Sequence, residues 1–367
     1  MPVSLGTSLQ VMVACLFALV LLLATPAARA AEGTQPSDPN APQDIFLLIG
    51  QSNMAGRAAI LQEDLDPVDG AFLFTGRGWE PLRNPVNRYS TVIAGDPTSR
   101  LGPGYTFARR LVERTGRRIG IVSNARGGTR IIQWQKGYDG DNDFDLYEQA
   151  VARAKMALEM TPGARLVGII WHQGEGDNSS GAASQYMNRL RQLVTDLRTD
   201  LNSPDATLII GEVGMWSGRG LHVNPVIRQV ERHIENAYWV TAAGLVPLPL
   251  SDGSPNMADP HFNTLSQRVL GLRYADKALE RIYGIDPGGV TLFAANELHD
   301  GVNFTGYSAT FPPGTYDAAT LLRHGIVADN LRSAQIESGY ELIIHTSEGD
   351  VQVTQDTSEL ALSGTVT

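Results

Sequence analysis

The stretch DIFLLIGQSNMAG, residues 44–56, joins a run of apolar residues to a group of small and polar ones. Its first half predicts a buried strand over 44–49. Ser52 and Asn53 then stand just beyond the carboxyl end of that strand. The Ser52 hydroxyl in this place is either a nucleophile or part of a helix cap or turn. The chemistry at the other strand ends decides between the two.

Four more β-rich apolar runs follow, and segments with helical periodicity separate them. We expect strands at 118–123, 166–171, 207–213 and 238–242, and helices at 104–115, 147–160, 184–199, 224–236 and 265–283. Alternation of helices with continuously apolar strands predicts a parallel sheet that helices cover on both faces. In such sheets, binding groups collect outside the carboxyl ends of the strands.

Composition limits the function classes. The chain has 367 residues, of which 43% are hydrophobic and 19% charged, so it is globular with at least one sizeable core. Its formal net charge is −10 and no run of Lys or Arg occurs. Since phosphate binding needs a clustered basic face, nucleic acid is not an expected partner.

Residues 1–30 are typical of an export signal. VMVACLFALVLLLA is apolar but short for a membrane span, and Ala-Arg-Ala at 28–30 is a small-x-small cleavage site. An uncleaved anchor is the alternative. The single cysteine, Cys15, lies in this segment, so a secreted or periplasmic protein would have no disulfide and no thiol nucleophile. A Pro-rich linker, 31–43, follows, and we expect no membrane contact after cleavage.

The second predicted strand is followed by NARGGTRIIQW. The adjacent glycines Gly127 and Gly128 leave backbone N–H groups unshielded, and such groups can bind a developing oxyanion. An ordinary strand-to-helix turn is the alternative. A nucleotide-binding loop is disfavoured because neither G-x-G-x-x-G nor G-K-[ST] is present.

The third predicted strand ends in WHQGEGDN, residues 171–178. Gln173 can donate its amide N–H to an oxyanion, and Glu175 can orient a neighbouring side chain. Capping and turn formation are the alternative roles. A metal site around His172 and Asp177 is disfavoured because no second His-rich cluster supplies further ligands.

The last motif is DPHFNTLSQRVLGLRYA. Thr264 and Gln267 form a capping-box pattern, which predicts that a helix starts just after Thr264. His261 then lies in the preceding loop, with Asp259 two residues earlier. Because residues i and i+2 of an extended segment point to the same side, Asp259 can accept a hydrogen bond from the His261 ring. A plain surface histidine is the alternative.

Taken together, these motifs indicate a serine hydrolase. An imidazole can take the proton of the Ser52 hydroxyl, and a carboxylate can fix the imidazole tautomer. The tetrahedral intermediate then needs about three N–H donors. The Ser52 backbone, the turn at Gly127 and Gly128, and the Gln173 side chain can provide them.

The blocks GQSNMAG, GPGYTFARRL, NARGGTRIIQW, WHQGEGD and DPHFNTLSQRVLGLRYA together resemble the carbohydrate esterases of the sialate O-acetylesterase and acetylxylan esterase group, within the SGNH hydrolases. The resemblance implies a flavodoxin-like α/β/α sandwich over 44–285. It implies removal of O-acetyl groups from an acetylated oligo- or polysaccharide through an acetyl-enzyme, with no cofactor for catalysis. Ser52 would be the nucleophile, His261 the base, and Ser52, Gly128 and Gln173 the oxyanion donors; Gln51 and Asn53 are expected to bind substrate.

The sequence departs from the family at the carboxylate. The family usually places two residues between the last Asp and His, whereas only Pro260 separates Asp259 from His261. Glu175 is therefore a competing partner for His261, and Asp252 is a third candidate. The serine also lacks the G-x-S-x-G elbow, which disfavours an α/β-hydrolase.

The sequence pattern changes over residues 286–367. Short runs of alternating apolar and polar residues, separated by turn residues, predict a small antiparallel β module there. VTLFAANELHDGVNFTGYSATFPPGTYD resembles a βγ-crystallin Greek key. That family's calcium motif would map onto Asp329, Asn330 and Ser333, although Ala334 replaces its last serine. A structural appendage without calcium is the alternative that we favour. A second hypothesis for the whole chain is an exported carbohydrate-binding or adhesive protein without catalytic activity.

Overall fold

The structure is a computed structural model that describes residues 41–93, 100–251 and 254–287, together with short stretches near the carboxyl terminus. Those stretches are 296–299, 308–311, 321, 331, 333–335, 342–346 and 349–353. The predicted export signal, most of the linker, and Asp252, Asp329 and Asn330 lie outside the described residues.

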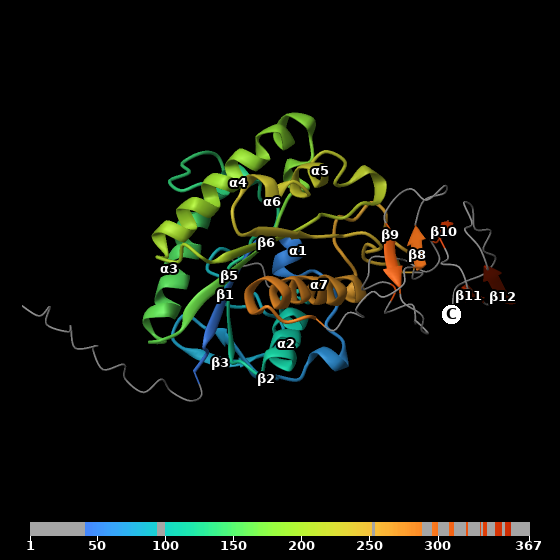
Figure 1. Ribbon diagram of the computed structural model, residues 1–367. Coiled ribbons are helices and arrows are strands. Elements are labelled where there is room, and N and C mark those ends of the chain that lie inside the picture. The colour runs from blue at the N-terminus through green and yellow to red at the C-terminus, as the bar shows by residue number, and fades with distance from the viewer. Residues whose placement is uncertain are drawn as a thin grey trace, which may run out of the picture. The chain divides into compact units, whose positions relative to one another are not determined.

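Seven strands form one sheet, in the order β3-β2-β4-β1-β5-β6-β7 (Figure 1). The strands are β1 (Asp44–Gly50), β2 (Val68–Phe74), β3 (Trp79–Leu82), β4 (Ile119–Ser123), β5 (Arg165–His172), β6 (Thr207–Gly211) and β7 (Ala237–Val240). The longer helices are α2 (Gly104–Thr115), α3 (Leu146–Glu159), α4 (Ser180–Asp200) and α7 (Thr264–Tyr283). Three helices of one turn are α1 (Ser52–Ala55), α5 (Asn224–Ile227) and α6 (Val230–His233).

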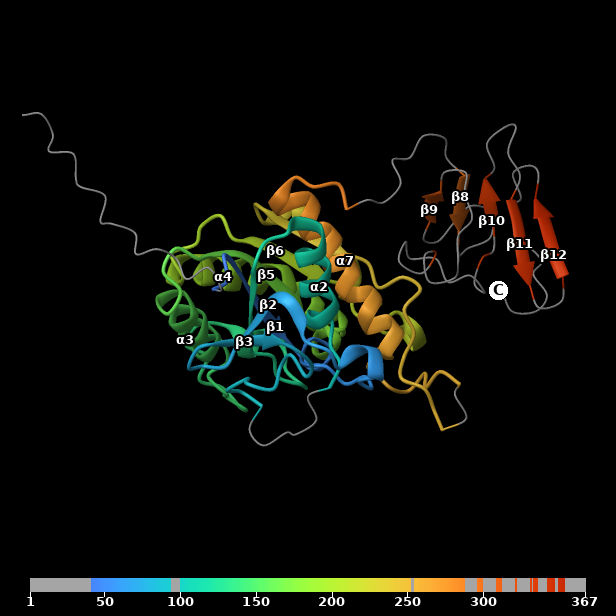
Figure 2. The same cartoon turned by 90° about the horizontal axis from the view of Figure 1, so that it is seen from below.

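The sheet separates two apolar cores. Successive side chains of a strand point to opposite faces, and β1 is apolar on both. Ile45, Leu47 and Ile49 pack into the core that α3 and α4 cover, whereas Phe46 and Leu48 pack into the core of α2 and α7. Figure 2 shows these two helix pairs on opposite sides of the strands. The predicted three-layer α/β/α sandwich is therefore confirmed.

The five predicted parallel strands are all present, each within about two residues of its expected limits. β2 and β3 were not predicted from the sequence. β3 runs antiparallel to β2, so this edge of the sheet is mixed. Pro81 in β3 suits an edge strand, because proline cannot donate to the ladder. The predicted helix 224–236 is instead α5 and α6, and the cap of α7 is Asn263, which accepts from the Ser266 N–H.

The order of the strands places a crevice at the carboxyl end of β1. β1 lies between β4 and β5, so the connections on its two sides diverge. Ligands bind at such switch points in open α/β sheets. The loops after β1, β4 and β5 carry Ser52, Gly128 and Glu175, which meet at this edge as the sequence predicts.

The strands described near the carboxyl terminus pair in antiparallel fashion, as predicted. β10 (Ser333–Gln335), β8 (Asn296–His299) and β9 (Ser308–Phe311) form one sheet, and β11 (Leu342–Thr346) pairs with β12 (Gly349–Val353). Of the three proposed calcium ligands only Ser333 is described, where it begins β10. The calcium site and the domain boundaries stay predictions.

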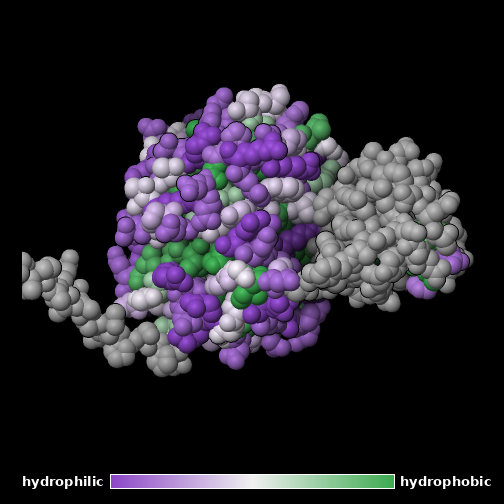
Figure 3. Space-filling view, viewed as in Figure 1, coloured by the Kyte–Doolittle hydropathy of each residue, from purple (hydrophilic) through white to green (hydrophobic). Residues whose placement is uncertain are grey.

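The surface of the described sandwich is mainly hydrophilic on the face drawn in Figure 3, with apolar residues in smaller patches. None of the helices described is both long and apolar enough to span a bilayer.

Candidate active site

Close contact between two backbones sets the position of Ser52. Gly50 ends β1 with a φ of 135°, and a Cβ there would lie 2.2 Å from the carbonyl oxygen of His172. Only glycine fits this approach. The Gln51 N–H then donates to that same carbonyl, at 2.8 Å, which fixes the turn from which Ser52 begins α1.

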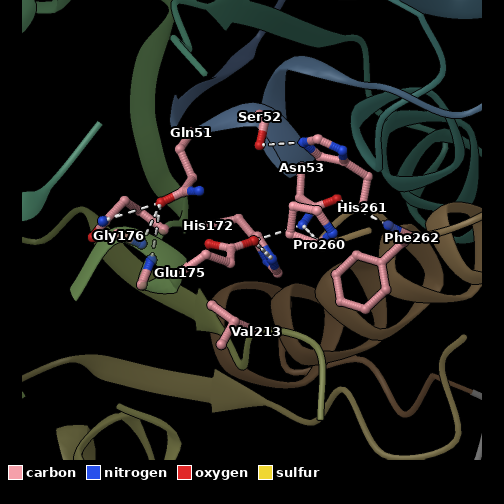
Figure 4. A network of polar contacts seen from close by, with 12 residues as sticks. Gln51, Ser52, Asn53, His172, Glu175, Gly176, Val213, Pro260, His261 and Phe262 are labelled. Carbon is pink, nitrogen blue, oxygen red and sulfur yellow. Dashed lines mark hydrogen bonds and ion pairs between the residues drawn. The ribbon is translucent and has the colours of Figure 1, made fainter. Parts of the chain in front are cut away.

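The side chains of Ser52, His261 and Asp259 form a chain of short contacts. Figure 4 shows the first of them, between Ser52 and His261. The distance from Ser52 Oγ to His261 Nε2 is 2.9 Å, and that from His261 Nδ1 to Asp259 Oδ1 is 2.8 Å. His261 and Ser52 are 209 positions apart in the sequence. A base that contacts the hydroxyl and a carboxylate that contacts the base is the geometry of an activated serine.

The short Asp-Pro-His spacing has a local explanation. Asp259 Oδ1 accepts the backbone N–H of His261 at 2.8 Å as well as contacting the His261 ring. An aspartate that binds the backbone two residues on closes an Asx-turn. The Trp216 indole donates to the Asp259 carbonyl oxygen at 2.8 Å and holds the turn from outside. One intervening residue is thus enough for contact.

Asn53 holds the segment that carries His261. Its Nδ2 donates to the Pro260 carbonyl oxygen at 3.1 Å, and its Oδ1 accepts from the Phe262 N–H at 3.1 Å. The Gln267 amide donates to the Asn53 carbonyl oxygen at 3.2 Å. Asn53 is fully buried and does not line the pocket beside Ser52. Asn53 therefore lies under the loop of His261, and not beside the substrate as its motif predicted.

Glu175 contacts Asn53 and not His261. Its Oε1 accepts from Asn53 Nδ2 at 2.6 Å and lies 3.9 Å from His172 Nε2. Burial raises the pKa of Glu175 to about 7, and burial lowers the pKa of His172 to about 3. Of the two carboxylates that the sequence left open, the structure brings Asp259 to the His261 ring.

We expect Glu175 to make the protein less stable as the pH rises. A carboxyl whose folded pKa is about 7, against about 4.3 when unfolded, favours folding below the lower value. This contribution, on the order of 3 kcal/mol, is lost as the pH rises through 7. Glu175→Gln should flatten the pH dependence of the unfolding free energy between pH 4.5 and about 8. The exposed control Glu113→Gln should leave this pH dependence unchanged. The unfolding free energy is measured by denaturant titration at each pH. If it fell with pH equally in Glu175→Gln and in the original protein, the prediction would be contradicted.

A pocket of about 450 Å³ opens beside Ser52. Its lining residues are Gln51, Ser52, Arg57, Ile93, Arg126, Gly127, Gly128, Pro260 and His261. A Cβ on Gly127 would lie 3.4 Å from Ser52 Cβ, so this turn passes directly over the serine. Gly128 has a φ of 74°, which favours glycine, and open space beside it. In the described ranges the N–H groups of Ser52 and Gly128 donate to no protein acceptor.

Gln173 does not reach this pocket, which corrects its predicted place among the oxyanion donors. Its side chain is fully buried, and its Nε2 donates to Asp177 Oδ2 at 2.8 Å, Thr129 O at 3.0 Å and Gln51 Oε1 at 3.2 Å. These three acceptors surround the Gln173 amide, which therefore links neighbouring loops to one another. Gln51, a predicted substrate-binding residue, does line the pocket.

Two guanidinium groups lie in the lining of the pocket. Arg57 and Arg126 both line it, and Arg126 stacks on the Phe144 ring. Burial lowers the pKa of His261; Asp259 opposes this effect and the charge of Arg57 adds to it. The ring is therefore neutral near pH 7 and able to accept a proton. Over the described part of the chain, no three His, Cys, Asp or Glu side chains group as metal ligands.

Comparison with known proteins agrees with this geometry. Residues 42–280 match the family model described as carbohydrate esterase, sialic acid-specific acetylesterase. The chain belongs to this carbohydrate esterase family. A relative from Arabidopsis thaliana, "Probable carbohydrate esterase At4g34215", is 30% identical over 260 residues, which cover 66% of this chain and 92% of the relative. We accordingly assign carbohydrate O-acetylesterase activity to the chain.

Two solved structures share the fold of the sandwich. The crystal structure of the Arabidopsis protein has a TM-score of 0.56 at 29% identity and covers 66% of this chain and 99% of its own. NanS has a TM-score of 0.50 at 18% identity and covers 65% of this chain and 98% of its own. A βγ-crystallin domain from Flavobacterium johnsoniae is 27% identical over 18% of this chain and 79% of that domain, with a TM-score of 0.18.

Proposed function

We propose that the protein is a serine esterase that removes O-acetyl groups from carbohydrates through an acetyl-enzyme on Ser52. The observation that carries the proposal is the continuous contact of Ser52, His261 and Asp259. His261 Nε2 takes the hydroxyl proton while Ser52 Oγ attacks the ester carbonyl. The same imidazole then returns the proton to the sugar oxygen, and the C–O bond to the sugar breaks.

Water completes the reaction by the same route. His261 removes a proton from a water molecule, whose oxygen attacks the acetyl carbonyl, and Ser52 Oγ leaves with the proton as acetate departs. Asp259 stabilises the imidazolium formed in each step and keeps Nε2 directed at Ser52. Each tetrahedral intermediate places its oxyanion near the unpaired N–H groups of Ser52 and Gly128.

The alternative of a catalytically inactive binding protein is less well supported. Asn53 is buried and hydrogen-bonds to the segment that keeps the His261 ring 2.9 Å from the Ser52 hydroxyl. A protein that only binds carbohydrate does not require this arrangement. Pocket-lining N–H groups without protein acceptors likewise suit a site where negative charge develops.

Because Arg57 and Arg126 line the pocket, an acetylated sugar that carries a carboxylate, of the sialate type, is the favoured substrate over neutral acetylxylan. We expect kcat/KM for acetate release from O-acetylated sialic acid to exceed that from acetylated xylan or chitin oligomers by about tenfold or more, because a charge-assisted hydrogen bond contributes about 1.5–3 kcal/mol. Arg126→Met should reduce the preference. Equal kcat/KM for all three substrates would contradict it, and acetate release from none would contradict the proposed function.

Residues 1–30 support a further proposal, that the enzyme is exported to the periplasm or the medium. Amino-terminal sequencing of protein recovered from those fractions should then begin at Ala31.

For the predicted module at 286–367, calcium titration by calorimetry should give heat and a raised Tm if Asp329, Asn330 and Ser333 form a site. No heat at millimolar calcium would remove that possibility.

A further inference from the structure

The side chain of Gln51 is held by its oxygen alone. Oε1 accepts from Gln173 Nε2 at 3.2 Å, from the Gly176 N–H at 3.4 Å and from the Gly174 N–H at 3.5 Å. All three donors belong to the loop that follows β5. Because they occupy one end of the amide, its orientation is fixed, and Nε2 must lie at the other end.

The Nε2 end of Gln51 faces the pocket. Gln51 lines the pocket together with Ser52, Gly128 and His261. In Figure 4, Oε1 points to Gly176 and Nε2 lies on the side of Ser52. Over the described residues, Nε2 donates to no protein acceptor, yet it is not among the buried polar atoms that lack a partner. Its two N–H bonds are thus available to a group bound beside Ser52.

We propose that Gln51 Nε2 donates a third hydrogen bond to the ester carbonyl oxygen as that oxygen becomes the oxyanion, a role that rests on the proposed serine mechanism. Ser52 and Gly128 provide the other two donors from their backbone N–H groups. No bond forms or breaks at Gln51. It stabilises the negative charge on the same oxygen in the acetylation and the deacetylation steps.

Gln173 is then a positioning residue for Gln51. Its amide is anchored on Asp177 Oδ2, which also accepts the Ile131 N–H at 2.8 Å just beyond the Gly128 turn. One buried carboxylate therefore ties the loop of Gly128 to the amide that orients Gln51. The geometry gives Gln173 an indirect effect on the oxyanion in place of direct contact.

Gln51→Glu is the sharpest test, because it keeps an oxygen for the three donors and replaces the N–H₂ group by a second oxygen. With p-nitrophenyl acetate, we expect both Gln51→Glu and Gln51→Ala to lower kcat by roughly 10²–10³-fold, the usual effect of removing one oxyanion donor. KM should change little, since the donor acts mainly in the transition state. The exposed control Gln192→Ala should retain full kcat.

The positioning role has its own signature. Gln173→Ala should lower kcat less than Gln51→Ala, and the double variant should be no slower than Gln51→Ala alone, because both changes remove the same hydrogen bond. Fully additive losses would contradict the positioning role. The proposal as a whole is tested by the Gln51 variants, whose folding is checked by an unchanged Tm. It would be overturned if Gln51→Glu and Gln51→Ala were folded and kept kcat within twofold of the original. If Ser52→Ala stayed inactive in that case, the serine mechanism would survive; activity in Ser52→Ala would overturn the mechanism itself.

Discussion

Ser52→Ala and His261→Ala are each expected to lower kcat for p-nitrophenyl acetate by roughly 10⁶-fold, the loss seen when a serine nucleophile or its base is removed. The physical reason is that the Ser52 hydroxyl is a weak nucleophile unless His261 Nε2, at 2.9 Å, takes its proton. Because the two groups act as one unit, the double variant should be no slower than either single variant.

Exposed residues of the same types provide matched controls for this experiment. Ser184 lies on α4 and His233 ends α6, and both are exposed. Ser184→Ala and His233→Ala should retain kcat. Turnover by Ser52→Ala or His261→Ala equal to that of these controls would remove the serine mechanism.

Asp259→Asn should lower kcat by roughly 10⁴-fold, as expected when the carboxylate that fixes the tautomer of a catalytic histidine becomes an amide. An asparagine can turn its NH₂ to His261 Nδ1, which would leave the proton on Nε2 and block its use as a base. Glu175→Gln should lower kcat by less than about tenfold, because a glutamine oxygen can still accept from Asn53 Nδ2. The assay is kcat at pH 7.5 for both folded variants.

The contrast between the two carboxylates is the informative part. Asp259 contacts the imidazole at 2.8 Å, whereas Glu175 acts on His261 only through Asn53 and the Pro260 carbonyl. A Glu175→Gln variant as slow as Asp259→Asn would mean that the buried carboxyl takes part in the chemistry. An Asp259→Asn variant with full activity would mean that His261 needs no carboxylate partner.

The alternating pattern was enough to predict the layers of the fold. Buried parallel strands such as β1 and β5 are continuous apolar runs, so the sequence signals them strongly. β3, at the edge of the sheet, and its neighbour β2 were missed because Gly70 and Pro81 interrupt the pattern. The split of 224–236 into α5 and α6 was not visible either, since helical periodicity does not show where a short helix ends.

For the site, the sequence predicted correctly which loops meet, but not where each amide points. The i and i+2 argument placed Asp259 beside His261, and the Asx-turn explains why it holds across one proline. Gln173 and Asn53 are polar residues next to a catalytic edge, so the motif alone suggested contact with substrate. Both are buried and hydrogen-bonded to backbone groups of distant loops, and such partners are set by tertiary packing.

The central claim is that the Ser52 hydroxyl carries the acetyl group between the two half-reactions. The most direct measurement is mass spectrometry of peptides from enzyme quenched in acid during the first turnover of p-nitrophenyl acetate. We predict one added acetyl group, on the peptide that contains Ser52, and its absence from Ser52→Ala. An acetyl group on a different peptide, or turnover at the full rate with every peptide unmodified, would contradict the account.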